Sequence, residues 1–213
     1  MNITNLGEVD DSTKAIIKEM ETVQKEFSDK YEQGKKLLGF SCGLEELDAH
    51  IDGLRPGHVW VIGAWTSTGK TQFALNIVHS VLEQGVATSI ISLEMSRVDT
   101  VARLIGIRNN ISSMAVLKGK NDKDVQERIS EGKAFLLQSP LEVHTTFFEL
   151  DKIKMLIRRD VYTKKVKFVV LDYVQNIISK KGQREYEIMT AAATELQALA
   201  REATGMGEGV LAD

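Results

Sequence analysis

Four short runs of apolar residues stand out along this chain because charge hardly interrupts them. They are HVWVIG (His58–Gly63), ATSIIS (Ala87–Ser92), AFLLQ (Ala134–Gln138) and VKFVVLD (Val166–Asp172). Runs of this kind are typical of strands that are covered on both faces. We therefore expect these segments to form a parallel sheet buried between two layers of helices.

Between these runs, apolar residues recur every three or four positions, which predicts helices. The predicted helices are Thr71–Glu83, Ser96–Arg108, Phe147–Tyr162 and Glu185–Ala203. Ser96 precedes Asp99 by three residues and Thr146 precedes Glu149 by three, a spacing typical of a capped helix start. The alternation of strands and helices predicts an α/β, doubly wound fold with right-handed crossovers.

A separate amphipathic helix is expected near the N-terminus, from about Asp11 to Lys36. Its apolar stripe consists of Ile16, Met20, Val23, Phe27 and Tyr31. Such a stripe has to be buried. The residues leave open whether it packs on another subunit or on the same chain.

The composition, 43% hydrophobic and 27% charged residues, is that of a globular protein. No apolar run reaches the roughly 18 residues of a membrane helix, and the N-terminus lacks the order of a secretory signal. The single Cys42 cannot form an internal disulfide. We expect a soluble, cytoplasmic protein without a membrane partner. A net charge of −3 gives no overall attraction to nucleic acid, so only a local basic loop could supply one.

The stretch GAWTSTGKTQF (Gly63–Phe73) lies between a predicted strand and a predicted helix and ends its loop with Gly-Lys-Thr. In this context the pattern predicts a phosphate-binding loop, whose backbone N–H groups surround the phosphates of a nucleotide. Its residues are Ala64, Trp65, Thr66, Ser67, Thr68, Gly69, Lys70 and Thr71. Ala64 replaces the first glycine of the pattern, which a strand end tolerates if φ stays negative, whereas a Cβ at Gly69 would obstruct a phosphate. The alternative is an ordinary strand–turn–helix with an accidental Gly-Lys-Thr.

Hydrolysis also needs a group that deprotonates water and a carboxylate near the metal. Glu94 follows the second apolar run, and Asp172 ends the last one. Because ligands of open α/β sheets bind at the carboxyl ends of the strands, both side chains are expected at the nucleotide. Each taken alone is also compatible with an ordinary surface carboxylate.

Taken in order, these residues resemble the RecA-type ATPase domain of DnaB-type replicative DNA helicases. The similar pieces are Gly39–Ile77, SLEMS (Ser92–Ser96), Glu127–Val143, FVVLDYVQNI (Phe168–Ile177) and Glu187–Glu202. SLEMS and LDYVQ are the specific pair, because RadA-like and KaiC-like ATPases share the phosphate loop but usually not these two strings. A KaiC-like protein would have two adjacent glutamates, whereas Met95 follows Glu94 here.

The resemblance implies a RecA-like P-loop NTPase that uses ATP and Mg²⁺. Lys70 and Thr71 would bind the β- and γ-phosphates and Mg²⁺, and Asp172 would hold the water shell of the metal. Glu94 would be the general base, and Gln175 would contact the γ-phosphate. Residues 37–213 would form this ATPase core, and residues 1–36 the segment with the linker helix.

Members of this family pass single-stranded DNA through a hexameric ring. The resemblance implies that the loop SKKGQRE (Ser179–Glu185) contacts DNA phosphates through Lys180, Lys181 and Arg184. A solvated basic loop is the alternative. The N-terminal helix stands where the family has a linker helix that docks on the neighbouring subunit, which favours self-association.

In the family, the helix ending near Glu202 leads into a further core strand, a sensor motif, a second DNA loop and an arginine finger. Here the sequence ends with ATGMGEGVLAD, and the family's primase-interacting N-terminal domain has no counterpart in it. The further strand would lie between the 58–63 strand and the Asp172 strand, so we expect a void there. Without an arginine finger, turnover would be lower by about 10³ to 10⁵. A second expectation is a nucleotide-binding module that joins a helicase ring without efficient turnover.

Overall fold

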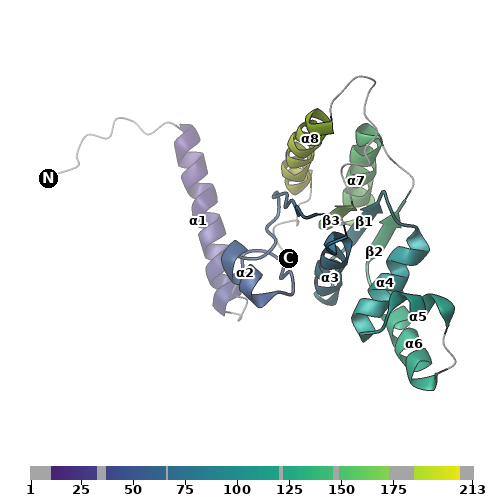
Figure 1. Ribbon diagram of the computed structural model, residues 1–213. Coiled ribbons are helices and arrows are strands. Elements are labelled where there is room, and N and C mark those ends of the chain that lie inside the picture. The colour runs from purple at the N-terminus through teal and green to yellow at the C-terminus, as the bar shows by residue number, and fades with distance from the viewer. Residues whose placement is uncertain are drawn as a thin grey trace. The chain divides into compact units, whose positions relative to one another are not determined.

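The computed structural model in Figure 1 describes residues 11–32, 37–65, 67–119, 122–145, 149–172 and 185–206. The chain divides into two compact units, residues 1–38 and 39–213. None of the helices in the described ranges combines the length and the apolar character needed to cross a bilayer.

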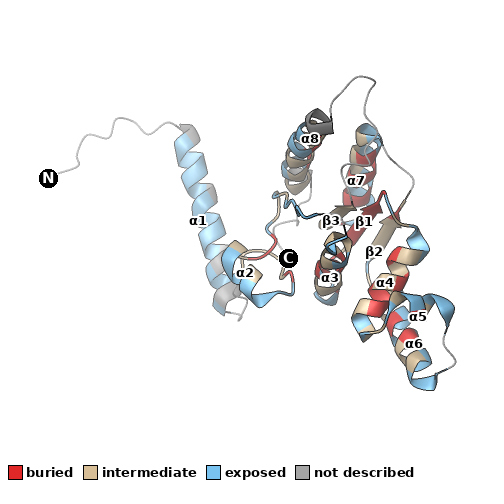
Figure 2. Cartoon of the chain, viewed as in Figure 1, coloured by how far each residue is buried: buried red, intermediate tan, exposed pale blue. Residues whose placement is uncertain are grey.

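The first unit contains the helix α1 (Asp11–Glu32), which confirms the amphipathic helix predicted there, with an end before Lys36. Its side chains are exposed wherever they are described (Figure 2). Ile16, Met20 and Val23 of the apolar stripe are 63%, 51% and 47% exposed. The described residues of this unit therefore provide no partner for the stripe.

The second unit is an α/β domain built on a parallel sheet in the order β2-β1-β3. The strands are β1 (Thr88–Ser92), β2 (Leu141–His144) and β3 (Phe168–Asp172). The helices are α2 (Glu45–Ile51), α3 (Lys70–Glu83), α4 (Arg97–Asn109), α5 (Ser113–Lys118), α6 (Lys123–Gln138), α7 (Leu150–Lys164) and α8 (Glu185–Met206).

The core consists of two apolar layers on opposite faces of the sheet. Ile91 packs with residues of α7 and α8, whereas its neighbour Ile90 packs with residues of α3 and α4. Figure 1 shows these helix pairs on the two sides of the strands. All five residues of β1 are buried, as Figure 2 shows. Coverage of both faces is the physical reason for the uninterrupted apolar runs in the sequence.

Two of the four predicted strands are confirmed, as β1 and β3, and the other two are wrong. Residues 134–138 are the last turn of α6, in which Phe135 and Leu136 pack on the core while Leu137 is 86% exposed. A short apolar run does not by itself distinguish a buried helix from a strand. Pro140 follows α6, and the strand of this region, β2, begins at the next residue.

Residues 58–63 form no strand, although the sequence predicts one there. Trp60, Val61 and Ile62 are 45%, 78% and 42% exposed. A groove of about 440 Å³ separates this segment from β3 and is lined by both of them and by α8. Without a hydrogen-bonding neighbour the segment cannot join the sheet. The groove lies between residues 58–63 and the Asp172 strand, where a void was expected in place of a further core strand.

The four helices predicted between the apolar runs are confirmed, with shifted ends. Only one of the two predicted capping boxes is confirmed. Ser96 caps α4, and its Oγ accepts the Asp99 N–H (3.1 Å). The N-cap of α7 is Glu149 instead of Thr146, and its side chain makes no capping hydrogen bond. The helices α2, α5 and α6 and the strand β2 were not among the predicted elements.

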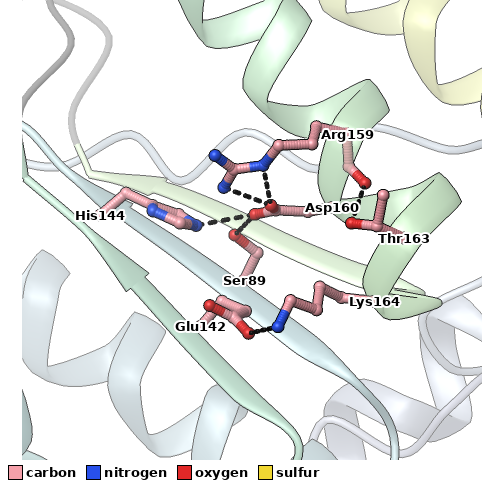
Figure 3. A network of polar contacts seen from close by, with 7 residues as sticks. All are labelled: Ser89, Glu142, His144, Arg159, Asp160, Thr163 and Lys164. Carbon is pink, nitrogen blue, oxygen red and sulfur yellow. Dashed lines mark hydrogen bonds and ion pairs between the residues drawn. The ribbon is translucent and has the colours of Figure 1, made fainter.

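A buried polar cluster fixes α7 to the strands below it (Figure 3). Asp160 of α7 is fully buried, and its Oδ2 accepts hydrogen bonds from Ser89 Oγ of β1 (2.9 Å) and His144 Nε2 of β2 (2.7 Å). Arg159 donates to Oδ1 (2.8 Å). Burial by itself would raise the pKa of Asp160, but the hydrogen bonds from Arg159, Ser89 and His144 hold the pKa below its ordinary value. The carboxylate is therefore charged and fully paired in the folded protein.

Candidate nucleotide site

The loop 63–69 precedes α3, whose first residue is Lys70 and whose N-cap is Gly69. Gly69 has φ 97° and ψ 21°, in the left-handed region that glycine adopts without strain. A Cβ at Gly69 would meet no described atom within 4 Å, so backbone conformation alone explains the glycine here. Obstruction of a phosphate by a Cβ stays a prediction. Ala64 is not among the residues with positive φ, which meets the condition for an alanine at this position.

The ammonium group of Lys70 lies over the loop. Its Nζ donates to the carbonyl oxygens of Ala64 (2.7 Å) and Trp65 (3.3 Å). Thr68 donates from its hydroxyl to the same Trp65 oxygen (2.7 Å). The first turn of α3 contains no acidic residue. The lysine charge and the positive end of the helix dipole therefore coincide at this loop, an arrangement that favours a bound anion.

Thr71, in the first turn of α3, and Asp172, at the end of β3, line one small cavity of about 10 Å³. Lys70 and Asp172 both line the larger groove beside β3. The structure thus places Asp172 with Lys70 and Thr71, which precede it by about a hundred positions in the sequence. The resemblance implies that Thr71 binds Mg²⁺ and that Asp172 holds its water shell, and the hydroxyl and carboxylate oxygens of these residues are ligand types that Mg²⁺ takes. Among the described residues no group of three or more His, Cys, Asp or Glu could hold a metal, so phosphate oxygens and water would supply the remaining ligands.

Glu94 lies in the connection between β1 and α4, two residues beyond Ser92. Ser92 pairs with Asp172 across the sheet, so Glu94 lies at the same edge as the metal candidates. Its side chain is exposed and makes no hydrogen bond or ion pair with other described residues. A carboxylate in this condition is free to bind a water molecule.

Five of the predicted site residues lie outside the described residues: Thr66, Gln175, Lys180, Lys181 and Arg184. The structure also adds two residues to the site, because Ser92 and Met95 line the cavity of Thr71 and Asp172. Both belong to the SLEMS string (Ser92–Ser96). The string that indicated Glu94 could therefore have indicated Ser92 and Met95 as well.

Comparison with known proteins matches residues 39–205 to the DnaB-like helicase C-terminal domain family. The chain belongs to this family. Replicative DNA helicase DnaB of Treponema pallidum is 28% identical over 176 residues, which are 81% of this chain and 40% of that protein. DnaB of Helicobacter pylori is 27% identical over 170 residues, 78% of this chain and 35% of that protein. This DnaB-like chain thus spans less than half the length of these relatives.

Two solved structures share the fold of this DnaB-like chain. The first, an isolated ATPase domain, has a TM-score of 0.72 at 20% identity, and the match covers 86% of this chain and 67% of that domain. The second, a DnaB-like replicative helicase described with its primase interactions, has a TM-score of 0.71 at 19% identity, and the match covers 93% of this chain and 46% of that helicase. The predicted RecA-like α/β fold is confirmed. The family match and the curated relatives, which are replicative DNA helicases, favour DnaB-like proteins over the RadA-like and KaiC-like alternatives.

Proposed function

We propose that this chain is the ATP-hydrolysing core of a replicative DNA helicase and couples ATP hydrolysis to movement on single-stranded DNA. The observation that carries the proposal is the common position of Lys70, Thr71 and Asp172, which line adjoining cavities at the start of α3 and the end of β3. Membership of the DnaB-like family supports the choice of ATP and DNA.

In this mechanism the N–H groups of the loop and the Lys70 ammonium bind the β- and γ-phosphates. Lys70 exchanges the neutral carbonyl oxygens of Ala64 and Trp65 for negatively charged phosphate oxygens, so binding adds an attraction between opposite charges. Bound Mg²⁺ would supply charge neutralisation at the phosphates, and Thr71 and Asp172 would hold it. Glu94 orients the attacking water and accepts its proton while the bond from the γ-phosphorus to the β-phosphate oxygen breaks.

The DNA contact and the ring are further parts of the proposal. Lys180, Lys181 and Arg184 would bind DNA phosphates, and Gln175 would contact the γ-phosphate. A hexamer would bury the exposed stripe of α1 on a neighbouring subunit.

The proposal is tested with the 213-residue chain by measuring steady-state ATP hydrolysis and duplex unwinding, with Mg²⁺ or EDTA and with or without single-stranded DNA. We expect Mg²⁺-dependent hydrolysis that single-stranded DNA stimulates. Nucleotide binding is read independently from tryptophan fluorescence, since both tryptophans, Trp60 and Trp65, lie in or next to the loop that precedes Lys70. Absence of both binding and hydrolysis would contradict the proposal.

Replacement of Lys70 by methionine is expected to lower ATP turnover by about 10² to 10³, because a preorganised charged donor to the phosphates is lost. The fluorescence response to Mg-ATP should weaken in parallel. Lys133→Met, at an exposed position of α6, is the matched control and should behave like wild type. Equal turnover in the two variants would exclude Lys70 from the site.

The double substitution Ile16→Asp with Met20→Asp is expected to abolish self-association. Burial of each apolar side chain in an interface contributes about 1.5 to 3 kcal/mol, and an aspartate would in addition lose its hydration. Light scattering after size exclusion measures the effect. Lys18→Asp with Lys25→Asp, also exposed on α1, controls for charge and should leave the mass unchanged. A wild-type chain that is monomeric with and without Mg-ATP would contradict the role of α1.

A further inference from the structure

Ser92 is the last residue of β1, and its hydroxyl group closes the turn that contains Glu94. The Met95 N–H donates to Ser92 Oγ (3.0 Å), so one side chain spans the three residues from Ser92 to Met95. Ser92 is 3% exposed and pairs with Asp172 in the sheet. The start of the turn is therefore fixed to the rigid part of the fold.

The remaining backbone of this turn is also held. The Leu93 N–H donates to the Asp172 carbonyl oxygen (2.6 Å), and the Leu93 side chain packs in the core of α7 and α8. Ser96 then caps α4. Glu94 is the exposed residue between buried Leu93 and half-buried Met95. The Ser92–Met95 bond holds the backbone N–H immediately after Glu94.

Ser92 also touches the metal side of the site, since it lines the cavity of Thr71 and Asp172. Its Oγ accepts the Met95 N–H, so the hydroxyl hydrogen remains available toward other acceptors. The buried Ser92 therefore contacts both parts of the site. It lines the cavity of Thr71 and Asp172, and it holds the turn that contains Glu94. General-base catalysis depends on the position of the base, because the carboxylate and the attacking water must be held within fractions of an ångström of the reactive geometry.

We propose that Ser92 is a positioning residue for ATP hydrolysis, which fixes the Glu94 carboxylate relative to Asp172 and Thr71. The inference rests on the proposed function. It assigns to Ser92 an effect on the rate of the chemical step and none on nucleotide binding, because its hydrogen bond holds the turn of Glu94, whereas Lys70 and the loop bind the phosphates. A hydroxyl that only stabilises a turn would change folding but not this rate.

Replacement of Ser92 by alanine removes the acceptor and is expected to lower kcat about 10- to 100-fold, with KM and Mg-ATP affinity unchanged within about twofold. Ser92→Cys keeps the size with a weak acceptor and should lie between alanine and wild type. Ser112→Ala is the matched control, because Ser112 Oγ accepts the Ala115 N–H (3.2 Å) with the same spacing at the start of α5. This control should keep wild-type kcat. Thermal unfolding of all variants separates rate effects from loss of folded protein.

A double-mutant cycle with Glu94→Gln decides whether Ser92 acts through Glu94. If it does, Ser92→Ala should not slow the Glu94→Gln variant further. Independent, multiplicative effects would overturn the inference, as would wild-type kcat in folded Ser92→Ala. The proposed function is tested separately. It is wrong if Glu94→Gln and Lys70→Met both keep wild-type turnover, or if the wild-type chain does not hydrolyse ATP. In either case the inference about Ser92 is wrong as well.

Discussion

Replacement of Glu94 by glutamine is expected to lower ATP turnover by about 10² to 10⁴, the contribution of a positioned general base. The amide keeps the size and shape of the side chain but cannot accept the proton of the attacking water. Binding should persist, because Lys70 and the loop of α3 interact with the phosphates without Glu94. Fluorescence titration of Trp60 and Trp65 with Mg-ATP should therefore give an unchanged Kd, while steady-state hydrolysis falls.

The exposed position of Glu94 makes this variant easy to interpret. Its side chain makes no hydrogen bond or ion pair with the rest of the described chain, so the substitution should leave the free energy of unfolding within about 0.5 kcal/mol of wild type. Glu127→Gln, at an exposed position of α6, is the matched control. Retention of full turnover by Glu94→Gln would assign the base to another residue.

Replacement of Asp160 by alanine is expected to destabilise the fold by about 3 kcal/mol, the lower end of the range for breaking a buried ion pair. The substitution leaves Ser89 and His144 without their acceptor inside the protein. Arg159 is 55% exposed and can turn its charge to solvent, which keeps the cost at the lower end. Urea unfolding followed by circular dichroism measures the effect.

Two control variants distinguish the contribution of the buried hydrogen bonds of Asp160 from that of its contact with Arg159. Arg159→Ala should cost less than Asp160→Ala, because Arg159 is half exposed and Asp160 keeps its hydrogen bonds from Ser89 and His144. Asp160→Asn keeps an acceptor and should fall between Arg159→Ala and Asp160→Ala. If Asp160→Ala is as stable as Arg159→Ala, the buried cluster does not hold α7 on the sheet.

Acidification should weaken the same cluster in the wild type. Burial would raise the pKa of Asp160, but the hydrogen bonds of Arg159, Ser89 and His144 lower it. The stabilisation is therefore present above the pKa of an unfolded aspartate, about 3.9, and is lost as the pH falls through the lower pKa of the folded protein. Asp160→Ala should lack this part of the acid dependence.

Local sequence patterns determined the elements whose stability is local. The cap of α4 at Ser96, the glycine before Lys70 and the long helices α1, α3 and α8 depend on contacts between residues a few positions apart. The candidate site residues were expected together for a different reason, the topology of a parallel sheet. Its residues stand at the ends of strands or the start of a helix, and in a parallel sheet all carboxyl ends share one edge.

The tertiary structure alone decided which apolar runs pair as strands. Residues 58–63 have the pattern of a buried strand but lie beside a groove, because a strand requires a neighbour whose backbone bonds with it. The run 134–138 became helix because its neighbours in α6 place Phe135 and Leu136 on the core. The hydrogen bonds of Asp160 likewise depend on how distant segments come together. A hydrophobic pattern predicts that a residue is buried, but only the packing of the whole domain determines which residues it contacts.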